Sequence, residues 1–213
     1  MKLFGYWRSS ATYRVRIALA LKGVEYEYVP INLLKGEHKS GDYLAKNPLG
    51  LVPSMETDSG EIVTQSIAIM EYLEESNPNP TILPDNAIDR ARARAMAQTL
   101  ACEAQPLMNL RIQNFLKNDM EASPEAMAAW LNQWPGGAMR SVERQVDKFG
   151  GDYCVGHTPT VADCCLVPQM YGALRFGIDV GDMPRLREIY ERCCALPAFA
   201  LAHPDNQIDA VKG

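Results

Sequence analysis

The pattern of apolar residues changes near residue 85, and this change most restricts how the chain can fold. Over about the first 80 residues, short strand-like runs alternate with helical ones, whereas amphipathic helical patterns prevail from Ile88 onward. A chain of 213 residues is long enough for two packed domains, each with its own core. We therefore expect one domain over residues 1–82 and an all-helical domain over residues 87–213.

The first domain begins with the pattern of a strand, a helix and a second strand. Residues 3–6 and 26–33 read as strands, and residues 12–22 carry apolar side chains at helical spacing. Gly23 stands where a left-handed C-cap ends a helix. The two strands flanking such a helix should be parallel.

The chain then shows a hairpin and a second helix. Residues 51–55 and 62–63 read as its strands, with a turn at residues 58–60 between them, and Ser66 offers an N-cap to a helix that stops before Asn77. This order of elements predicts an α+β, thioredoxin-like domain. In the helical domain, the run Pro135-Gly136-Gly137 should break a helix, and Thr160 with Asp163 has the spacing of a capping box.

Composition restricts the function. A net charge of −5 with no basic patch argues against a nucleic-acid partner. No segment is apolar for long enough to cross a bilayer, and the first residues lack the pattern of a secretion signal. The six cysteines follow residue 100 without a C-x-x-C, and the three histidines are scattered. We therefore expect a soluble cytoplasmic protein with reduced thiols and no metal.

The chemistry of a thioredoxin-like domain usually depends on a cysteine at the start of its first helix, and this chain has Ser9 and Ser10 there. Any thiol used at that position must arrive with a ligand, for which glutathione is a candidate. A helix N-terminus favours a thiolate, and a serine hydroxyl adds a charge-assisted hydrogen bond. Each unit of thiol acidification needs about 1.4 kcal/mol. The alternative is that either serine only caps the helix, and spacing does not decide between the two.

Two further pairs of residues suit a peptide-like ligand. A proline that enters a strand at Val52-Pro53 requires a cis bond or an edge position, and a cis bond would turn the Val52 backbone outward. At Gln65-Ser66 a helix begins, so the N–H and hydroxyl of Ser66 could hold a carboxylate or only cap the helix.

Together these residues resemble the zeta-class glutathione transferases, whose members include maleylacetoacetate and maleylpyruvate isomerases. Residues 9–19 read SSATYRVRIAL, similar to the family pattern S-S-C-x-x-R-V-R-I-A-L. The similarity extends along nearly the whole chain, through Asn47-Pro48, Val52-Pro53, Gln65-Ser66, residues 71–75 (EYLEE), residues 105–107 (QPL) and residues 162–169 (ADCCLVPQ).

The resemblance implies a cytosolic glutathione transferase fold and assigns roles to individual residues. Ser9, with Ser10 beside it, would activate the glutathione thiol, Val52 would pair with the peptide backbone, and Gln65 with Ser66 would hold the γ-glutamyl end. Other implied contacts to glutathione are Ala11, Thr12, Tyr13, Arg14, His38, Gln105, Asn109, Leu110 and Arg111. Arg8, Arg111 and Arg175 are the candidates for binding a dicarboxylate substrate.

The implied activity is a glutathione-dependent cis–trans isomerisation of maleylacetoacetate, or a similar maleyl diketo acid, by a homodimer. Maleylpyruvate isomerisation and transfer to, or dehalogenation of, small halogenated acids are the alternatives. A non-catalytic binding protein is a further alternative, but the presence of Ser9, Val52 and Ser66 together argues against it. A glutathione-dependent oxidoreductase is disfavoured because the helix starts with Ser9 and Ser10 and has no cysteine there. Ala11 stands where the family has a cysteine that is implied to tune substrate handling, so the resemblance implies the mechanism but leaves the substrate preference open. Tyr6 is a competing hydroxyl donor to the thiol, although Ser9 is preferred.

Overall fold

The computed structural model describes residues 1–211, which form two compact units. The first unit combines residues 1–82 with residues 195–211, and the second spans Leu83–Cys194. The expectation of a helical domain over residues 87–213 is therefore corrected at its C-terminal end. The physical reason is that the last helix packs against the first one, where the buried Arg16 donates a hydrogen bond to the Ala202 carbonyl at 3.0 Å.

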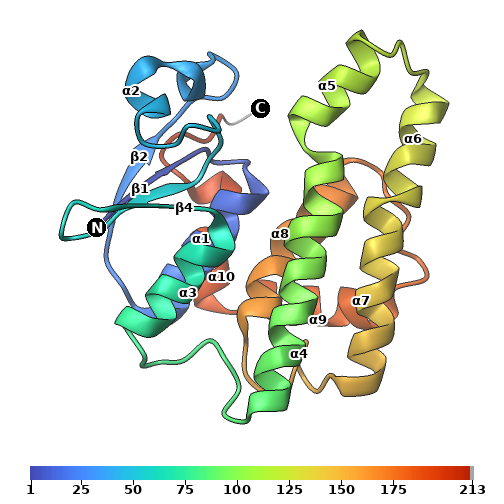
Figure 1. The fold of residues 1–213 in the computed structure, drawn as a ribbon. Helices are drawn as coiled ribbons and strands as arrows, with labels where there is room; N and C mark the ends of the chain where they lie inside the picture. Colours follow the sequence, from blue (N-terminus) through green and yellow to red (C-terminus); the bar gives the residue numbers. More distant parts are fainter. Residues whose placement is uncertain (212–213) are drawn as a thin grey trace. The chain divides into compact units, whose positions relative to one another are not determined.

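The first unit is built on a four-stranded sheet with strand order β2-β1-β3-β4 (Figure 1). The strands are β1 (Lys2–Gly5), β2 (Glu27–Pro30), β3 (Ser54–Glu56) and β4 (Ile62–Thr64). Strand β1 is parallel to β2 and antiparallel to β3, and β3 pairs with β4 as a hairpin. The predicted parallel pair, the hairpin and the thioredoxin-like order are confirmed.

Helices complete this unit. They are α1 (Ser10–Lys22), the short α2 (Gly41–Leu44), α3 (Ser66–Ser76) and α10 (Pro197–Ala202), with 3₁₀ turns at Glu37–Lys39 and Pro204–Asn206. Helix α1 packs against α3 and α10. It ends as predicted at Gly23, which adopts φ 63° and donates its N–H to the Ala20 carbonyl at 3.3 Å.

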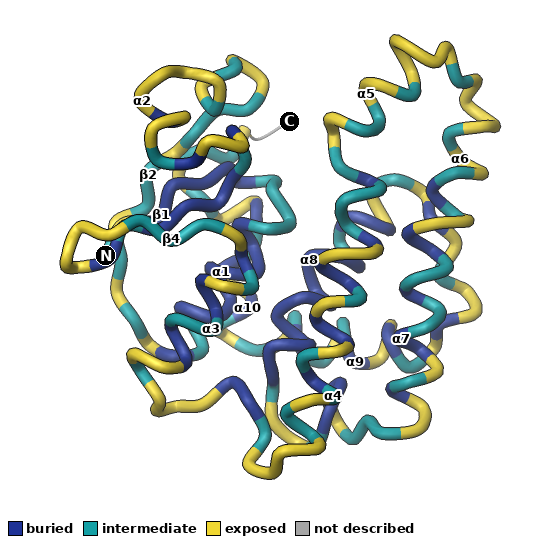
Figure 2. The backbone as a smooth tube through the Cα atoms, in the orientation of Figure 1, coloured by how far each residue is buried: buried dark blue, intermediate teal, exposed yellow. Residues whose placement is uncertain are grey.

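Helix α1 is buried on almost all sides, as the dark tube in Figure 2 shows. Val15, Ile17 and Leu19 are fully buried, and each such side chain contributes about 1.5–3 kcal/mol. The close approach of the helix to the end of β1 requires Gly5, because a Cβ atom there would lie 2.3 Å from Cγ2 of Thr12. The first turn of α1 is therefore fixed against the sheet by direct packing.

A buried ion pair fixes the other end of α1. The Lys22 ammonium lies 2.7 Å from the Glu74 carboxylate on α3 and donates to the Pro80 carbonyl at 2.9 Å. Glu74 also accepts hydrogen bonds from the Thr81 hydroxyl and the Ile82 N–H. Burial alone raises the pKa of Glu74, but the Lys22, Thr81 and Ile82 hydrogen bonds outweigh it, so the pKa lies below its ordinary value.

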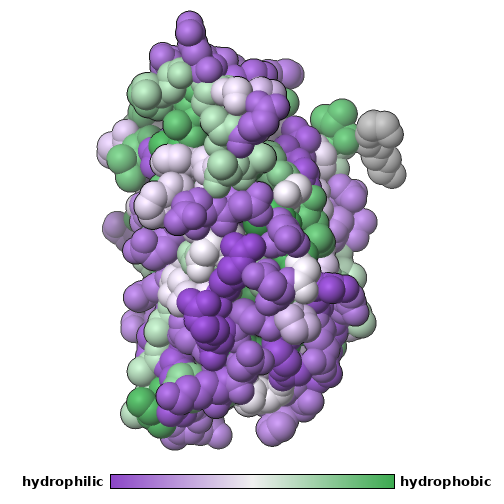
Figure 3. Space-filling model, turned by 90° about the vertical axis from the view of Figure 1, so that its right-hand side faces the viewer, coloured by the Kyte–Doolittle hydropathy of each residue, from purple (hydrophilic) through white to green (hydrophobic). Residues whose placement is uncertain are grey.

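The regular elements of the second unit are helices and helical turns. The elements are α4 (Ala87–Gln98), a π-helical turn (Thr99–Ala104), a 3₁₀ turn (Gln105–Met108), α5 (Leu110–Asn118), α6 (Pro124–Gln133), α7 (Pro135–Phe149), α8 (Val161–Arg175) and α9 (Pro184–Cys194). The predicted break is confirmed, because α6 ends before Trp134 and Pro135 opens α7. On the face drawn in Figure 3, hydrophilic side chains predominate.

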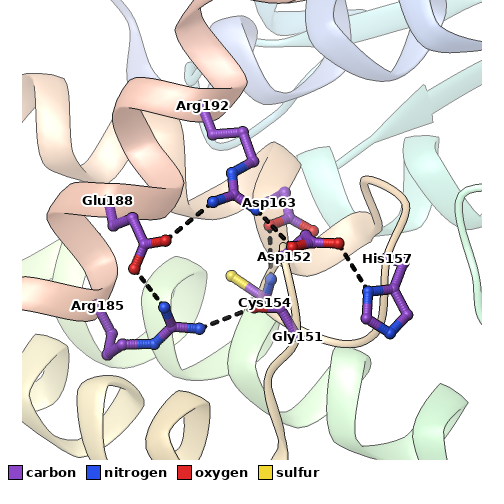
Figure 4. Close-up of polar contacts among 8 residues, drawn as sticks. All are labelled: Gly151, Asp152, Cys154, His157, Asp163, Arg185, Glu188 and Arg192. Atoms are coloured by element: carbon purple, nitrogen blue, oxygen red, sulfur yellow. Dashed lines mark hydrogen bonds and ion pairs between the residues drawn. The ribbon is translucent and has the colours of Figure 1, made fainter.

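The loop before α8 is held by charged groups. The predicted capping box is confirmed: Thr160 donates its N–H to the Asp163 carboxylate at 2.7 Å, and Asp163 also accepts the Cys154 N–H at 2.9 Å. Asp152 lies in the same loop (Figure 4), and its carboxylate oxygens make 2.7 Å contacts with Arg192 of α9 and with His157. Within residues 1–211, no helix is long and apolar enough to span a membrane.

Candidate active site

Ser9 ends a tight turn and caps α1. Its N–H donates to the Tyr6 carbonyl at 3.0 Å, and its Oγ accepts the Thr12 N–H at 3.2 Å. The capping role considered from the sequence is therefore real. It uses one lone pair of the hydroxyl and leaves the proton available for donation to an anion, so capping and thiolate stabilisation are compatible.

The residues that follow Ser9 divide into two groups. Ser10 and Ala11 are partly exposed at the helix end, where the first N–H groups have no acceptor within the helix. Thr12 and Tyr13 are buried, at 0% and 1% exposure. The side chains of these two residues therefore pack α1 into its unit, and the open part of the helix end is formed by Ser9, Ser10 and Ala11.

The start of α3 is joined to α1 by Arg14. This buried guanidinium donates from Nη1 to the Ser66 Oγ at 3.1 Å. Arg14 follows Ser9 by five residues, which is about 7.5 Å along the helix axis. The structure thus places a cation and the N-terminus of a second helix close to the Ser9 end of α1, and both favour a carboxylate.

The prediction that Ser66 caps α3 is wrong by one residue. Gln65 is the N-cap, with φ 71° and ψ 120°, and its side chain makes no capping hydrogen bond. Ser66 begins the helix, and its hydroxyl accepts the bond from Arg14 instead. A positive φ is strained for a glutamine. The Gln65 side chain is exposed, and it lies beside the N–H groups in the first turn of α3.

Val52 precedes a cis peptide bond to Pro53, one of the two possibilities predicted from the sequence. The carbonyl of the preceding Leu51 accepts hydrogen bonds from Tyr43 Oη and Asn47 Nδ2, both at 2.7 Å. Within residues 1–211, the backbone of Val52 makes no hydrogen bond. The neighbouring loop is therefore anchored while the polar groups of Val52 remain available to an extended ligand.

His38 and Tyr6 have different surroundings. His38 lies in a 3₁₀ turn, and its buried Nδ1 has no hydrogen-bond partner within the described chain. Burial, and then Lys39, lowers the pKa of His38, which favours the neutral ring. Tyr6 is buried in a hydrophobic cluster with Phe4, Trp7, Tyr43 and Val52, which assigns its ring to packing.

Trp7 and Arg8 are the central residues of the turn before Ser9. The Arg8 guanidinium lies 4.7 Å from the centroid of the Trp7 ring, and no carboxylate pairs with it in the described part of the chain. A stacked guanidinium keeps its edge N–H groups for an anion.

Two groups hold the Trp7 backbone, and sequence reasoning missed both roles. The Trp7 N–H donates to Asp209 Oδ2 at 3.0 Å, and Arg16 Nη2 donates to the Trp7 carbonyl at 3.0 Å. Asp209 lies 202 positions away, so no local spacing could have revealed it. Arg16 was visible in the family-like motif, but without a role.

The candidate residues of the second unit lie at the start of α5 and the end of α8. Gln105 opens the 3₁₀ turn that follows the π-helical turn, and Asn109 caps α5 by accepting the Arg111 N–H at 3.1 Å. Leu110 and Arg111 are exposed at the first turn of α5. Arg175 is exposed at the end of α8, with its guanidinium 4.7 Å from the centroid of the Phe176 ring.

Several known proteins are similar to this chain. Residues 1–75 match the family model "Glutathione S-transferase, N-terminal domain". The chain is 44% identical to the maleylacetoacetate isomerase of Pseudomonas aeruginosa over 211 residues, which cover 98% of each protein. The chain belongs to the zeta class of glutathione transferases.

Two solved structures of zeta-class relatives are similar over the full chain. A bacterial zeta-class maleylpyruvate isomerase in holo form superposes with a TM-score of 0.94 at 41% identity, covering 99% of this chain and 100% of that one. A maleylacetoacetate isomerase from Methylobacterium extorquens AM1, with bound malonate and glutathione, gives a TM-score of 0.93 at 38% identity, covering 100% of both chains. The predicted fold class, with a thioredoxin-like domain and a helical domain, is confirmed.

Proposed function

We propose that this protein is a glutathione-dependent cis–trans isomerase that acts on maleylacetoacetate or a similar maleyl diketo acid. The observation that carries the proposal is the geometry of Ser9, whose Oγ accepts the Thr12 N–H and keeps its own proton for an anion. No cysteine precedes Cys102, so the sulfur at this helix end belongs to a ligand. Full-length similarity to isomerases of both maleyl diketo acids supports the reaction type.

The residues of the first unit fit the chemical groups of glutathione. The first turn of α1 and the Ser9 hydroxyl suit a thiolate, the backbone of Val52 suits a peptide unit, and the α3 N-terminus with Arg14 suits the γ-glutamyl carboxylate. Gln65 and Ser66 form the entry to that second helix end. The buried, partnerless Nδ1 of His38 gives a further polar atom for a ligand at the neighbouring loop.

When bound, glutathione supplies a thiolate that adds reversibly to the cis double bond, so that the resulting single bond can rotate. Ser9 lowers the cost of the thiolate by donating a hydrogen bond, and α1 contributes the partial positive charge of its N-terminus. Because the hydroxyl is already oriented by the Thr12 N–H, little ordering remains when the anion forms. Glutathione is regenerated and is not consumed.

Arginines bind the substrate carboxylates in this proposal. Arg8 stacks on Trp7 beside the thiol site and has no carboxylate partner among the described residues. Arg111 and Arg175, which are exposed in the second unit, supply further guanidinium groups of the kind that grips carboxylates with two parallel hydrogen bonds. Ala11 places a small apolar side chain where the family has cysteine, and we assign to it an influence on substrate preference.

The experiment that tests the function follows the ultraviolet absorbance of maleylacetoacetate and of maleylpyruvate with catalytic glutathione, while total thiol is titrated. We expect isomerisation of at least one diketo acid at a constant thiol concentration. Transfer or dehalogenation, which the comparisons do not favour, would instead consume one thiol per turnover of a halogenated acid. Loss of thiol with such an acid, with neither diketo acid isomerised, would refute the isomerase.

We further propose that the enzyme is a cytoplasmic homodimer. The cytoplasmic assignment is supported by the six cysteines, which lie in the described chain and form no disulfide, as expected for a reducing compartment. The dimer rests on the family resemblance. Light scattering coupled to gel filtration would measure it, and a mass of 23.6 kDa, that of one chain, would contradict it.

A further inference from the structure

The turn that delivers Ser9 to its position is held from outside by two oppositely charged side chains. The turn runs from Tyr6 to Ser9 and is closed by the Ser9 N–H on the Tyr6 carbonyl at 3.0 Å. Asp209 accepts the Trp7 N–H at 3.0 Å, and Arg16 donates to the Trp7 carbonyl at 3.0 Å. Both peptide groups of Trp7 are therefore fixed, one by an anion and the other by a cation.

These bonds restrict how the turn can rotate. Hydrogen bonds to charged groups are roughly twice as strong as neutral ones, and here the acceptor and the donor act on successive peptide planes. The Tyr6 carbonyl lies in the same peptide plane as the Trp7 N–H, so rotation of that plane would carry it out of line with the Ser9 N–H. The direction of the Ser9 hydroxyl thus depends on groups that do not touch it.

The Asp209 carboxylate is itself held in place. Its Oδ2 also accepts the Tyr28 hydroxyl from β2 at 3.3 Å, and its Oδ1 is buried with no hydrogen-bond partner in residues 1–211. Burial raises the pKa of Tyr28, against the effect of Arg16, so the phenol stays protonated and donates. Ala210 packs against the Trp7 cluster beside it. The C-terminal segment is therefore seated on the turn by polar and apolar contacts together.

We propose that Asp209 is a positioning residue for the thiol-activating Ser9, acting through the Trp7 N–H. This inference rests on the proposed function of Ser9. Asp209 contacts neither the thiol nor the substrate in this account. Its role is to hold the turn so that the hydroxyl proton points at the thiolate whenever one is bound.

The test compares Asp209→Ala with Asp209→Asn, which keeps an oxygen acceptor, and with the control Asp205→Ala. Asp205 lies in the same segment and is exposed; its carboxylate lies 3.7 Å from His203 Nδ1, to which its own N–H donates at 3.3 Å. Hydrogen exchange of the Trp7 amide is measured without ligand, and the pKa of the bound glutathione thiol is measured from thiolate absorbance. The kcat and KM are measured below and above that pKa.

For Asp209→Ala we expect Trp7 exchange to accelerate about tenfold and the bound thiol pKa to rise by about 0.5–1 unit, which is a three- to tenfold loss of thiolate. Below the thiol pKa, kcat should fall by the same factor while KM for the diketo acid stays within about twofold, because only the activating group has moved. Asp209→Asn should recover at least half of each effect, and Asp205→Ala should match the wild type.

An unchanged thiol pKa in Asp209→Ala, with faster Trp7 exchange or a lower melting temperature, would overturn the proposal and leave Asp209 as a structural contact. If Asp209→Ala fails to fold, Asp209→Glu replaces it in the test, because it keeps the charge but moves the acceptor oxygen. An unaltered thiol pKa in Asp209→Glu, together with faster exchange of the Trp7 amide, would equally overturn the proposal. Failure of the proposed function is distinct, because the wild-type protein would then show no lowered thiol pKa at all.

Discussion

Replacing Ser9 separates two tasks that its hydroxyl performs. Ser9→Ala removes the capping bond to the Thr12 N–H, which costs about 1 kcal/mol of stability. It also removes the donor to the thiolate, and a hydrogen bond to a charged group contributes about 1.5–3 kcal/mol. At 1.36 kcal/mol per unit, the pKa of the bound glutathione thiol should rise by about 1–2 units. The acidic limb of the pH–rate profile should move to higher pH by the same amount.

The two tasks are resolved by further variants. Ser9→Asp caps as well as serine, so stability should be kept, but its negative charge faces the thiolate and should raise the thiol pKa at least as much as alanine does. Ser9→Thr retains both functions and should resemble the wild type. The matched control is Ser123→Ala at the start of α6, where Oγ accepts the Ala126 N–H at 3.3 Å. It should lose comparable stability and leave the thiol unaffected.

The measurements are thermal unfolding and ultraviolet titration of the bound thiolate, each on all four variants. The reasoning is refuted if Ser9→Ala and Ser123→Ala lose similar stability while the thiol pKa is the same in both. In that case the Ser9 hydroxyl would only cap α1, and the thiol would be activated by other groups.

Further substitutions test the fold around the site. Gln65→Gly should relieve the strain at φ 71° and raise the free energy of unfolding by about 0.5–1 kcal/mol, yet weaken glutathione binding about fivefold in calorimetry. Lys22→Met should cost about 3–5 kcal/mol in denaturant unfolding, because Glu74 stays buried without its cation. In the wild type, the pKa of Glu74 is lower in the folded protein than in the unfolded chain, so the ionised carboxylate stabilises the fold fully above the pKa of an unfolded glutamate. This contribution to the free energy of unfolding is lost as the pH falls through the pKa of Glu74 in the folded protein. Glu74→Gln should therefore make the stability depend less on pH in the acid range. Gly5→Ala should lower the free energy of unfolding by about 1–3 kcal/mol, because the new Cβ would lie 2.3 Å from Cγ2 of Thr12. Adding Thr12→Ser removes that Cγ2 atom and should recover part of the lost stability. No recovery would show that another contact is responsible.

Local features of the fold could be predicted because their causes are local. Gly23 ends α1 through its own left-handed conformation, and Thr160 with Asp163 begins α8 through bonds made within four residues. The break at Pro135 needs only the missing N–H and ring of that residue. Such features depend on neighbours in sequence, so a pattern read along the chain identifies them.

The errors arose where a partner distant in sequence competes with a local preference. Ser66 has the chemistry of an N-cap, but Arg14, 52 positions away, engages its hydroxyl, and Gln65 takes the cap position at a positive φ that spacing would not suggest. Likewise, residues 195–211 read as part of a helical domain until Arg16 and Trp7 are seen to bind them. The candidate site was found largely through family-like motifs, whereas Asp209 required the structure.

The seating of the C-terminal segment on the first unit has a consequence for protein synthesis. Asp209 is added to the nascent chain 202 residues after its partner Trp7. At about 5–20 residues per second, this interval lasts ~10–40 s. The Ala202 carbonyl, which accepts the hydrogen bond of the buried Arg16, is likewise made only after all residues of the helical unit Leu83–Cys194. The unit that is translated first is therefore completed last.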